Sequence, residues 1–500
     1  MPIVKHIPLR RGSDTEDVLW RVAKNAAWLA LADGLRLVRV VTNILLARFL
    51  GPADYGTMTL ARETVRYAAL PGDMGIATYG QAEAARCADY ELTGLAEEVL
   101  PARAVIGVIL FALFSGACIL TLHDTTTRLV FLLTGIVVIS ETLRADWLFR
   151  GRERFDLLIV ARAVESIGFL LVALLVGSRR HAVIFDTAGW SAAEVAMSAV
   201  WLLMLRDLLG RAIRLRVNFR AWLRHAREAI YLPIALALVW AGWLLLLWIV
   251  TCSGSRRDAG TLAAPYNLTQ SLVNLGAVLV MAFFPTSATL DRESQVFAQS
   301  RRAFTELMLI FSLPIGALGG TVSTRLISLT LGSGYQESAQ LFEVLIWLAP
   351  LRLLRMTYSY TLISSGFLKP FLVGPAVSFL TMAALGLPLC LLYRLPGAAL
   401  AALGAELFAT AATIMTSYSC HRDAAMPRAG VLVKIVALNL GLTLLGAPVA
   451  DRFGPAVYLI SAGVVYVAGI IALGLVDIAK IAAIFARRTG RTTGVTSASS

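Results

Sequence analysis

Apolar runs of about twenty residues follow one another along almost the whole chain, with short polar connectors between them. A run of this length crosses the hydrocarbon core of a bilayer as an α-helix, whose backbone hydrogen bonds are all internal. The alternating strand pattern of a membrane barrel is not found in the sequence. We therefore expect an all-α polytopic membrane protein. Hydropathy predicts about fourteen spans, near residues 25–47, 56–80, 100–122, 128–149, 157–176, 183–205, 229–251, 262–285, 304–331, 340–363, 371–393, 396–419, 431–450 and 455–478.

Composition argues against a soluble domain. Hydrophobic residues make up 58% of the chain and charged residues 15%, whereas soluble domains average about 25% charged residues. The net charge of +13 would suggest nucleic-acid binding in a soluble protein, but here the basic residues lie between apolar runs. The five cysteines and five histidines show no metal-ligand or disulfide spacing. We expect no metal, no cofactor and no nucleic-acid partner.

The distribution of basic residues predicts the orientation in the membrane. With a cytoplasmic N-terminus, that side carries at least twice as many arginines and lysines as the opposite side. The positive-inside rule then places both termini in the cytoplasm, which requires an even number of spans. The basic groups that decide this are Lys369 and those within residues 5–24, 150–154, 206–227, 292–302, 422–428 and 480–491.

A connector with seven arginines, residues 206–228, divides the spans into two groups. One interpretation is a basic connector that only enforces topology. The other is an amphipathic helix on the membrane surface that binds anionic lipid or a lipid-diphosphate headgroup. The expected organisation is a cytoplasmic segment 1–24, an N-terminal lobe 25–205, the connector 206–228, a C-terminal lobe 229–480 and a disordered cytoplasmic tail 481–500.

A weak internal repeat relates the two groups of spans. A shift of 204 residues places the first predicted span on the seventh, and it superimposes three identical residues in the connectors that follow. Three identities without gaps are compatible with chance, but their agreement with the span-for-span match favours a duplication. Internal repeats with a central site between them are common among transporters. The superimposed residues are Asp54, Gly56 and Thr57 on Asp258, Gly260 and Thr261.

Four arginines lie within the first two spans, where a charged side chain costs roughly 2.5–3.5 kcal/mol and usually faces a partner or a polar space. Arg36 and Arg39 are three residues apart, and Arg62 and Arg66 are four apart on one helix face. Guanidinium groups bind phosphate bidentately, so the cluster predicts a site for a diphosphate or an acidic sugar. The alternative is internal pairing, with Asp33 for Arg36 and with Glu63 or Asp73 for Arg66.

The seventh and eighth spans carry aromatic and amide side chains, which stack on sugars and hydrogen-bond to them. The candidates are Trp240, Trp243, Tyr266, Asn267 and Gln270. For the two tryptophans, anchoring at the membrane interface is the alternative.

Other intramembrane charges are weaker candidates. Arg352 and Arg355 are further substrate-binding candidates, and Asp33 and Glu406 are candidates for the group that couples transport to an ion gradient. Glu406 is the most isolated acid within a span. Two pairs are expected to be structural, namely Glu141 with Arg144 and Arg162 with Glu165.

Residues 47–76, ARFLGPADYGTMTLARETVRYAALPGDMGI, resemble the signature around the first two spans of bacterial polysaccharide flippases. Four more segments resemble the family's motifs in the family's order, and together they extend from about residue 25 to 370. These are Asp146-Trp147-Leu148-Phe149-Arg150-Gly151 with Glu153-Arg154-Phe155, Phe284-Pro285, Leu331-Gly332-Ser333-Gly334-Tyr335 with Ser338-Ala339, and Ser365-Gly366 with Lys369.

The resemblance implies two pseudo-symmetric lobes around a central cavity, lined chiefly by spans one, two, seven and eight. The family belongs to the multidrug/oligosaccharidyl-lipid/polysaccharide exporter superfamily, and its members work in the bacterial cytoplasmic (inner) membrane. The implied activity is translocation of undecaprenyl-diphosphate-linked oligosaccharide repeat units by alternating access, with membrane lipids and the polysaccharide polymerase machinery as further partners. We expect no enzyme activity. The alternatives are a cation or drug antiporter of the same superfamily and a membrane-embedded polysaccharide polymerase or ligase.

On these residues the expected site has two parts. The arginines of the N-terminal half would bind the diphosphate, and the aromatic and amide groups of the C-terminal half would bind the glycan.

Overall fold

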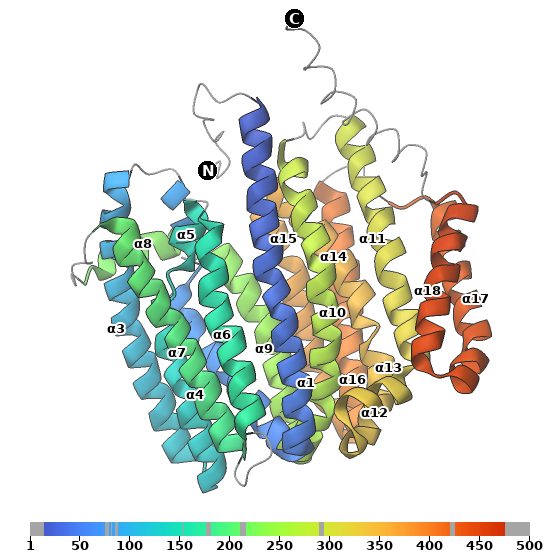
Figure 1. Cartoon of the computed structure of the whole chain (residues 1–500), viewed down its shortest axis with the longest axis horizontal. Coiled ribbons are helices and arrows are strands. Elements are labelled where there is room, and N and C mark those ends of the chain that lie inside the picture. Colours follow the sequence, from blue (N-terminus) through green and yellow to red (C-terminus); the bar gives the residue numbers. More distant parts are fainter. Residues whose placement is uncertain are drawn as a thin grey trace, which may run out of the picture.

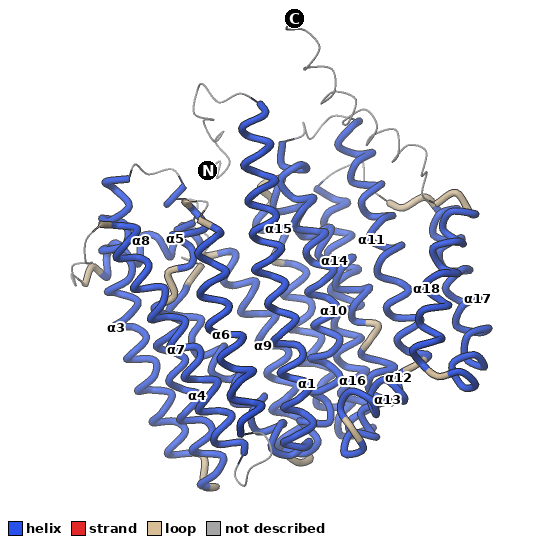
Figure 2. Tube along the Cα trace, viewed as in Figure 1, coloured by secondary structure: helices blue, strands red, loops and turns tan. Residues whose placement is uncertain are grey.

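The computed structural model describes residues 15–75, 80–81, 83–85, 89–152, 154–176, 182–210, 217–289, 295–420 and 426–475. Within these ranges every regular element is helical (Figure 2), as expected of an all-α membrane protein. The expected tail 481–500 and part of the expected N-terminal segment and connector lie outside these ranges. The helices are α1 (Thr15–Asp73), α3 (Asp89–Thr121), α4 (Thr125–Leu143), α5 (Asp146–Gly151), α6 (Phe155–Val176), α7 (Ala182–Leu209), α8 (Phe219–Ala229), α9 (Tyr231–Ser253), α10 (Arg256–Thr289), α11 (Gln295–Thr321), α12 (Ser323–Leu331), η1 (Ser333–Tyr335), α13 (Gln336–Leu345), α14 (Leu348–Ser364), α15 (Leu368–Phe371), α16 (Val373–Cys420), α17 (Ala429–Phe453) and α18 (Pro455–Ala472).

The predicted spans lie mainly within described helices, and two helices each contain two spans. α1 is interrupted at Gly51, where φ is 70°, and α16 at Arg394, where φ is 53°. A left-handed residue breaks the helical path, and glycine adopts it without the steric cost that a side chain brings. Arg394 therefore holds a strained conformation at the second interruption.

Two predicted spans differ from the helices observed. The span expected at 304–331 ends with α11 at Thr321 and continues as the short helix α12. The span expected at 340–363 is divided into α13 and α14. The pair α12–α13 forms a helical hairpin at one end of the molecule (Figure 1), where the Ser323 hydroxyl donates to Glu343 at 2.8 Å. Hydropathy does not detect these two breaks because the segments on both sides of each break are apolar.

Eight of the described helical segments are long and apolar enough to cross a membrane. They contain parts of α3, α4, α6, α7, α9, α11, α16 and α18. α1 and α10 are not among them, although they occupy the middle of the molecule (Figure 1). Both carry the charged and amide side chains predicted to bind substrate. This distribution is typical of helices that face a polar space rather than lipid.

We call α1 to α7 the N-terminal lobe and α9 to α18 the C-terminal lobe; α1 and α10 lie in the middle of the molecule, with α3 to α7 on one side and α11 to α18 on the other (Figure 1). The start of α1, the end of α18 and all of α8 lie at the same end of the molecule, opposite the α12–α13 hairpin. We call these the terminal end and the hairpin end. One large core joins the two lobes through α1, α9 and α10, while a second core around Trp147 and Trp201 belongs to the N-terminal lobe.

Candidate substrate site between the two lobes

The best-defined polar cluster lies in the C-terminal lobe, where α9 and α10 pack side by side. Trp243 of α9 stacks on Tyr266 of α10, with ring centroids 3.4 Å apart and planes 7° from parallel. Arg352 of α14 lies over the ring of the same tyrosine, with its guanidinium carbon 5.0 Å from the Tyr266 centroid. Its Nη2 donates to the Tyr266 hydroxyl at 3.0 Å. The cluster therefore combines a stacked aromatic pair with a cation.

Arg352 is held by two more polar groups. Its Nη1 donates to Gln270 Oε1, and its Nε donates to Glu406 Oε2 at 3.2 Å. Glu406 also accepts hydrogen bonds from Arg355, which is buried. Two guanidinium groups thus share one carboxylate, which leaves one net positive charge in the cluster.

Two contacts connect the lobes beside this cluster. The Arg66 guanidinium of α1 lies over the Trp240 ring of α9, 5.9 Å from its centroid. The Asn267 amide of α10 donates to the hydroxyl of Tyr55 in α1 at 2.9 Å. Arg66 is also bound by Glu63 at 2.8 Å, yet its side chain remains 44% exposed. Arg66 therefore has an acidic partner on its own helix and still keeps an accessible side chain.

The other arginines of α1 have partners inside the N-terminal lobe. Arg39 forms an ion pair with Glu165 of α6 and lies 3.8 Å from Glu194 of α7. Arg62 lies between the rings of Phe169 and Trp190, 4.8 and 4.7 Å from their centroids. Two of the four arginines of the expected cluster therefore contact acids or rings of their own lobe. Arg36 and Asp33 lie in α1, and their side chains are outside the described residues.

Several of the expected ion pairs are present. Arg66 pairs with Glu63, and Arg144 pairs with Glu141 at 2.9 Å. Asp73, the other partner considered for Arg66, pairs with Arg103. Glu165 forms an ion pair with Arg39 of α1, and its expected pairing with Arg162 stays a prediction. Glu406, the most isolated acid in the sequence, has two arginine partners.

A group of buried polar residues in the N-terminal lobe was not identified as functional from the sequence. Asp186 is fully buried, and neither carboxylate oxygen has a hydrogen-bond partner in the described structure. Glu194 and Arg103 are also almost fully buried. Asp186 and Glu194 are acids within the predicted span 183–205, so their unusual position in an apolar run was the available signal. In the described part of the chain, no set of three His, Cys, Asp or Glu side chains is arranged to hold a metal ion.

The hairpin end of the interface between the lobes is closed. A Cβ atom at Gly56 of α1 would overlap the Arg256 carbonyl of α10, and one at Gly260 of α10 would overlap the Pro52 carbonyl of α1. Absence of side chains lets two helices approach to backbone contact. At the same end, Arg256 Nη1 binds Asp124 Oδ2 at 2.9 Å, which joins the α3–α4 connector to α10.

The family of polysaccharide biosynthesis proteins matches this chain over residues 22–291, more than half of its length. The chain belongs to this family. The family confirms the resemblance drawn from the motifs that follow the first and fourth spans.

A relative with a similar sequence is the "Putative O-antigen transporter" of Escherichia coli (strain K12). It is 23% identical over 406 residues, which cover 78% of this chain and 95% of the relative.

Solved structures show where the fold belongs. The lipid II flippase MurJ, in an inward closed conformation, has a TM-score of 0.72 at 13% identity, covering 89% of this chain and 97% of MurJ. An inward-facing multidrug resistance MATE family transporter of the MOP superfamily has a TM-score of 0.59 at 13% identity, covering 78% of this chain and 96% of the transporter. The chain is therefore a multi-pass membrane protein with the fold of that superfamily.

Proposed function

We propose that this protein is a flippase that moves undecaprenyl-diphosphate-linked oligosaccharide repeat units across the bacterial cytoplasmic membrane. The observation that carries the proposal is the set of side chains where the lobes meet. Arg66 over Trp240, and Trp243 stacked on Tyr266 beneath Arg352, place cations next to aromatic faces. A ligand that is both a glycan and a diphosphate needs this combination.

The structure changes which residues we assign to each part of the ligand. Arg66 and Arg352 are the candidates for the diphosphate, because Arg66 is exposed and the Arg352 cluster keeps a net positive charge. Trp240 and the amides of Gln270 and Asn267 are the candidates for the sugars. Arg39 pairs with Glu165, and Arg62 contacts two aromatic rings. We propose that both arginines position α1 within its lobe.

Alternating access requires that the two ends open in turn. The hairpin end is closed by the contact of Gly56 with Gly260 and by Asp124 with Arg256. We propose that the terminal end faces the cytoplasm, in keeping with the positive-inside rule, and that substrate enters there. Opening of the hairpin end would then separate α1 from α10 and release the glycan outside. The described start of α1 and end of α18 share the terminal end (Figure 1), so both termini would be cytoplasmic.

Among the coupling candidates, Glu406 is bound by Arg352 and Arg355. We propose that it holds the two arginines in place, because protonation would leave two buried cations without a counterion. Asp33 stays a candidate from the sequence alone.

One observation favours the alternative of a cation or drug antiporter. Asp186 is a fully buried carboxylate without a hydrogen-bond partner among the described residues. A carboxyl group buried within a predicted span is a candidate for binding a proton or a cation during transport. The same residue could couple a flippase to a proton gradient, so the transported substrate decides between the two functions.

Deletion of the gene and complementation by the full-length protein test the proposal. The expected result is loss of surface polysaccharide together with accumulation of intact lipid-linked repeat units on the cytoplasmic face. Normal polysaccharide together with increased sensitivity to cationic drugs would support the antiporter and contradict the flippase. Accumulation of single repeat units on the outer face would instead indicate a polymerase.

A further inference from the structure

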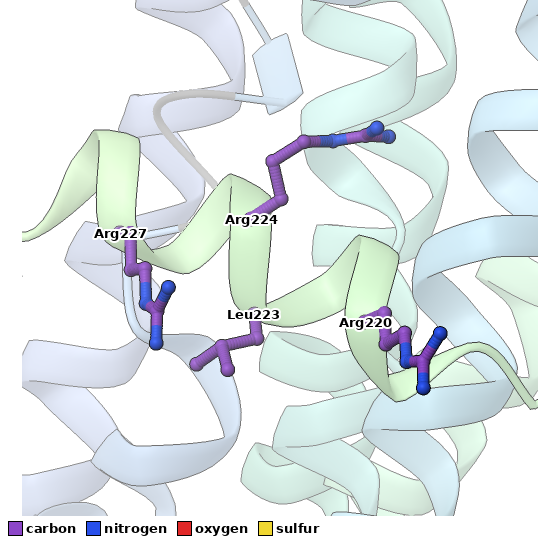
Figure 3. Close-up of a pocket in the computed structure, with 4 residues that line it drawn as sticks. All are labelled: Arg220, Leu223, Arg224 and Arg227. Carbon is purple, nitrogen blue, oxygen red and sulfur yellow. The ribbon is translucent and has the colours of Figure 1, made fainter.

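The short helix α8 joins the two lobes at the terminal end of the molecule (Figure 1). Its polar face carries Arg220, Leu223, Arg224 and Arg227, at positions i, i+3, i+4 and i+7. This spacing puts the four positions on one face of a helix, although the Arg224 side chain extends away from the other three (Figure 3). They line an open depression of about 390 Å³, and Figure 3 shows the side chains of Arg220, Leu223 and Arg227 extending toward the same side of α8.

The arginines of this face are largely uncompensated. Arg224 forms an ion pair with Glu98 of α3 at 3.4 Å, but its side chain stays 62% exposed. Arg220 and Arg227 are exposed and have no ion pair in the described part of the chain. An exposed arginine cluster of this kind attracts an anion from outside the protein.

Apolar side chains accompany the arginines. Trp222 packs against the core around Trp147 and Trp201 and so fixes α8 to the end of the N-terminal lobe. Phe219 and Leu223 remain exposed next to the arginines. Exposed apolar groups beside guanidinium groups are typical of a helix that lies in the headgroup region of a membrane, where arginine stems also cover apolar surface.

We propose that the arginine face of α8 binds the headgroups of anionic phospholipids in the cytoplasmic leaflet. Arg220 and Arg227 would bind the lipid phosphates, and Phe219 and Leu223 would enter the boundary with the acyl chains. Charge complementarity argues for anionic phospholipid, since zwitterionic lipid offers no net charge to balance two free guanidinium groups. This site is separate from the side chains between the lobes and does not depend on which substrate the protein carries.

The test compares lipid binding to the full-length protein and two double variants. Arg220→Gln/Arg227→Gln removes the two unpaired charges of α8, and Arg257→Gln/Arg452→Gln removes two exposed charges at the hairpin end. Each purified protein is titrated in detergent with phosphatidylglycerol or phosphatidylethanolamine, and bound lipid is counted by native mass spectrometry. We expect the affinity of the α8 variant for phosphatidylglycerol to fall by about tenfold. The affinity of the matched control should be unchanged.

Equal binding of the two lipids by the wild-type protein would overturn the proposal, as would an equal loss in both double variants. Preferential displacement of phosphatidylglycerol by undecaprenyl diphosphate would identify a substrate-entry site and would also overturn it. If the double variant does not fold, Arg227→Gln and Arg227→Lys give the same comparison, because only the first removes the charge. Retention of phosphatidylglycerol is read without any transport assay, so the proposed function can fail while this result stands.

Discussion

Gly56 of α1 and Gly260 of α10 pack against each other with their backbones in contact. These two glycines are equivalent under the 204-residue repeat, and so are Pro52 and Arg256, whose carbonyls each face the opposite glycine. Contact between equivalent residues is what a two-fold axis produces, as in symmetric dimers. This is the contact expected if the repeat relates the lobes by a pseudo-two-fold axis.

Substitution of either glycine tests this contact. Gly56→Ala or Gly260→Ala should lower the free energy of unfolding by about 1–3 kcal/mol, because a methyl group has to displace backbone atoms. Thermal unfolding in detergent measures the effect. Gly116→Ala in α3 is the control, since a Cβ atom there meets nothing within 4 Å; it should leave stability equal or slightly raised. Equal stability of all three variants would show that the helices separate easily at this point.

The shared carboxylate of Glu406 gives a second prediction. Glu406→Gln should lower the free energy of unfolding by about 3–5 kcal/mol, because it leaves Arg352 and Arg355 buried without a counterion. Adding Arg355→Gln should restore part of the loss, so a double-mutant cycle measures the coupling. Asp156→Asn is the comparison, because its ion pair with Arg154 is half-exposed and should contribute only about 0–1 kcal/mol. If the effects of the two substitutions on stability simply add, Glu406 and Arg355 are not coupled and the shared carboxylate is contradicted.

The two tryptophans of α9 should respond differently. Trp243→Ala removes a buried ring that stacks on Tyr266, so it should cost about 3–5 kcal/mol of stability. Trp240 is only partly buried, and Trp240→Ala should reduce glycan transport with a smaller change in stability. Melting temperature and surface polysaccharide, measured in parallel, separate the two effects. Loss of stability without loss of transport in Trp240→Ala would mean that this ring only packs.

The ion pair at the hairpin end should be insensitive to physiological pH. Hydrogen bonds from Thr127 at the start of α4, with a smaller effect of Arg256, lower the pKa of Asp124 to about 2. A lowered pKa contributes stability that is complete above the unfolded value of about 3.9 and is lost as the pH falls through about 2. The difference in melting temperature between the wild type and Asp124→Asn should therefore be constant from pH 8 to pH 5. A difference that shrinks over this range would contradict the assignment.

The sequence predicted the features that depend on local composition and spacing. Apolar length located the long helices, and spacing of three residues identified the pairs of Arg66 with Glu63 and Arg144 with Glu141. The repeat also identified Gly56 and Gly260 as equivalent before their contact was known.

Contacts between distant helices were not predictable in this way. Glu406 is 54 residues from Arg352, and nothing in either segment specifies that their helices adjoin. Likewise Arg39 meets acids of α6 and α7 rather than a neighbour on its own helix. Whether an arginine can bind substrate depends on which neighbouring helix its side chain faces, and hydropathy does not contain that information.

Translocation by the purified protein tests the central claim most directly. The protein is reconstituted into vesicles with a fluorescent undecaprenyl-diphosphate oligosaccharide, and a glycosidase added outside reports the fraction of glycan that reaches the outer leaflet. We expect the wild type to move the labelled lipid of the inner leaflet to the outer leaflet, where the glycosidase cleaves it. Arg66→Glu should do so much more slowly, and the control variant Arg257→Gln, also at an exposed arginine, should behave as the wild type. The proposed function would be contradicted if folded wild-type protein left the labelled lipid of the inner leaflet uncleaved while it moved a cationic dye across the same vesicles.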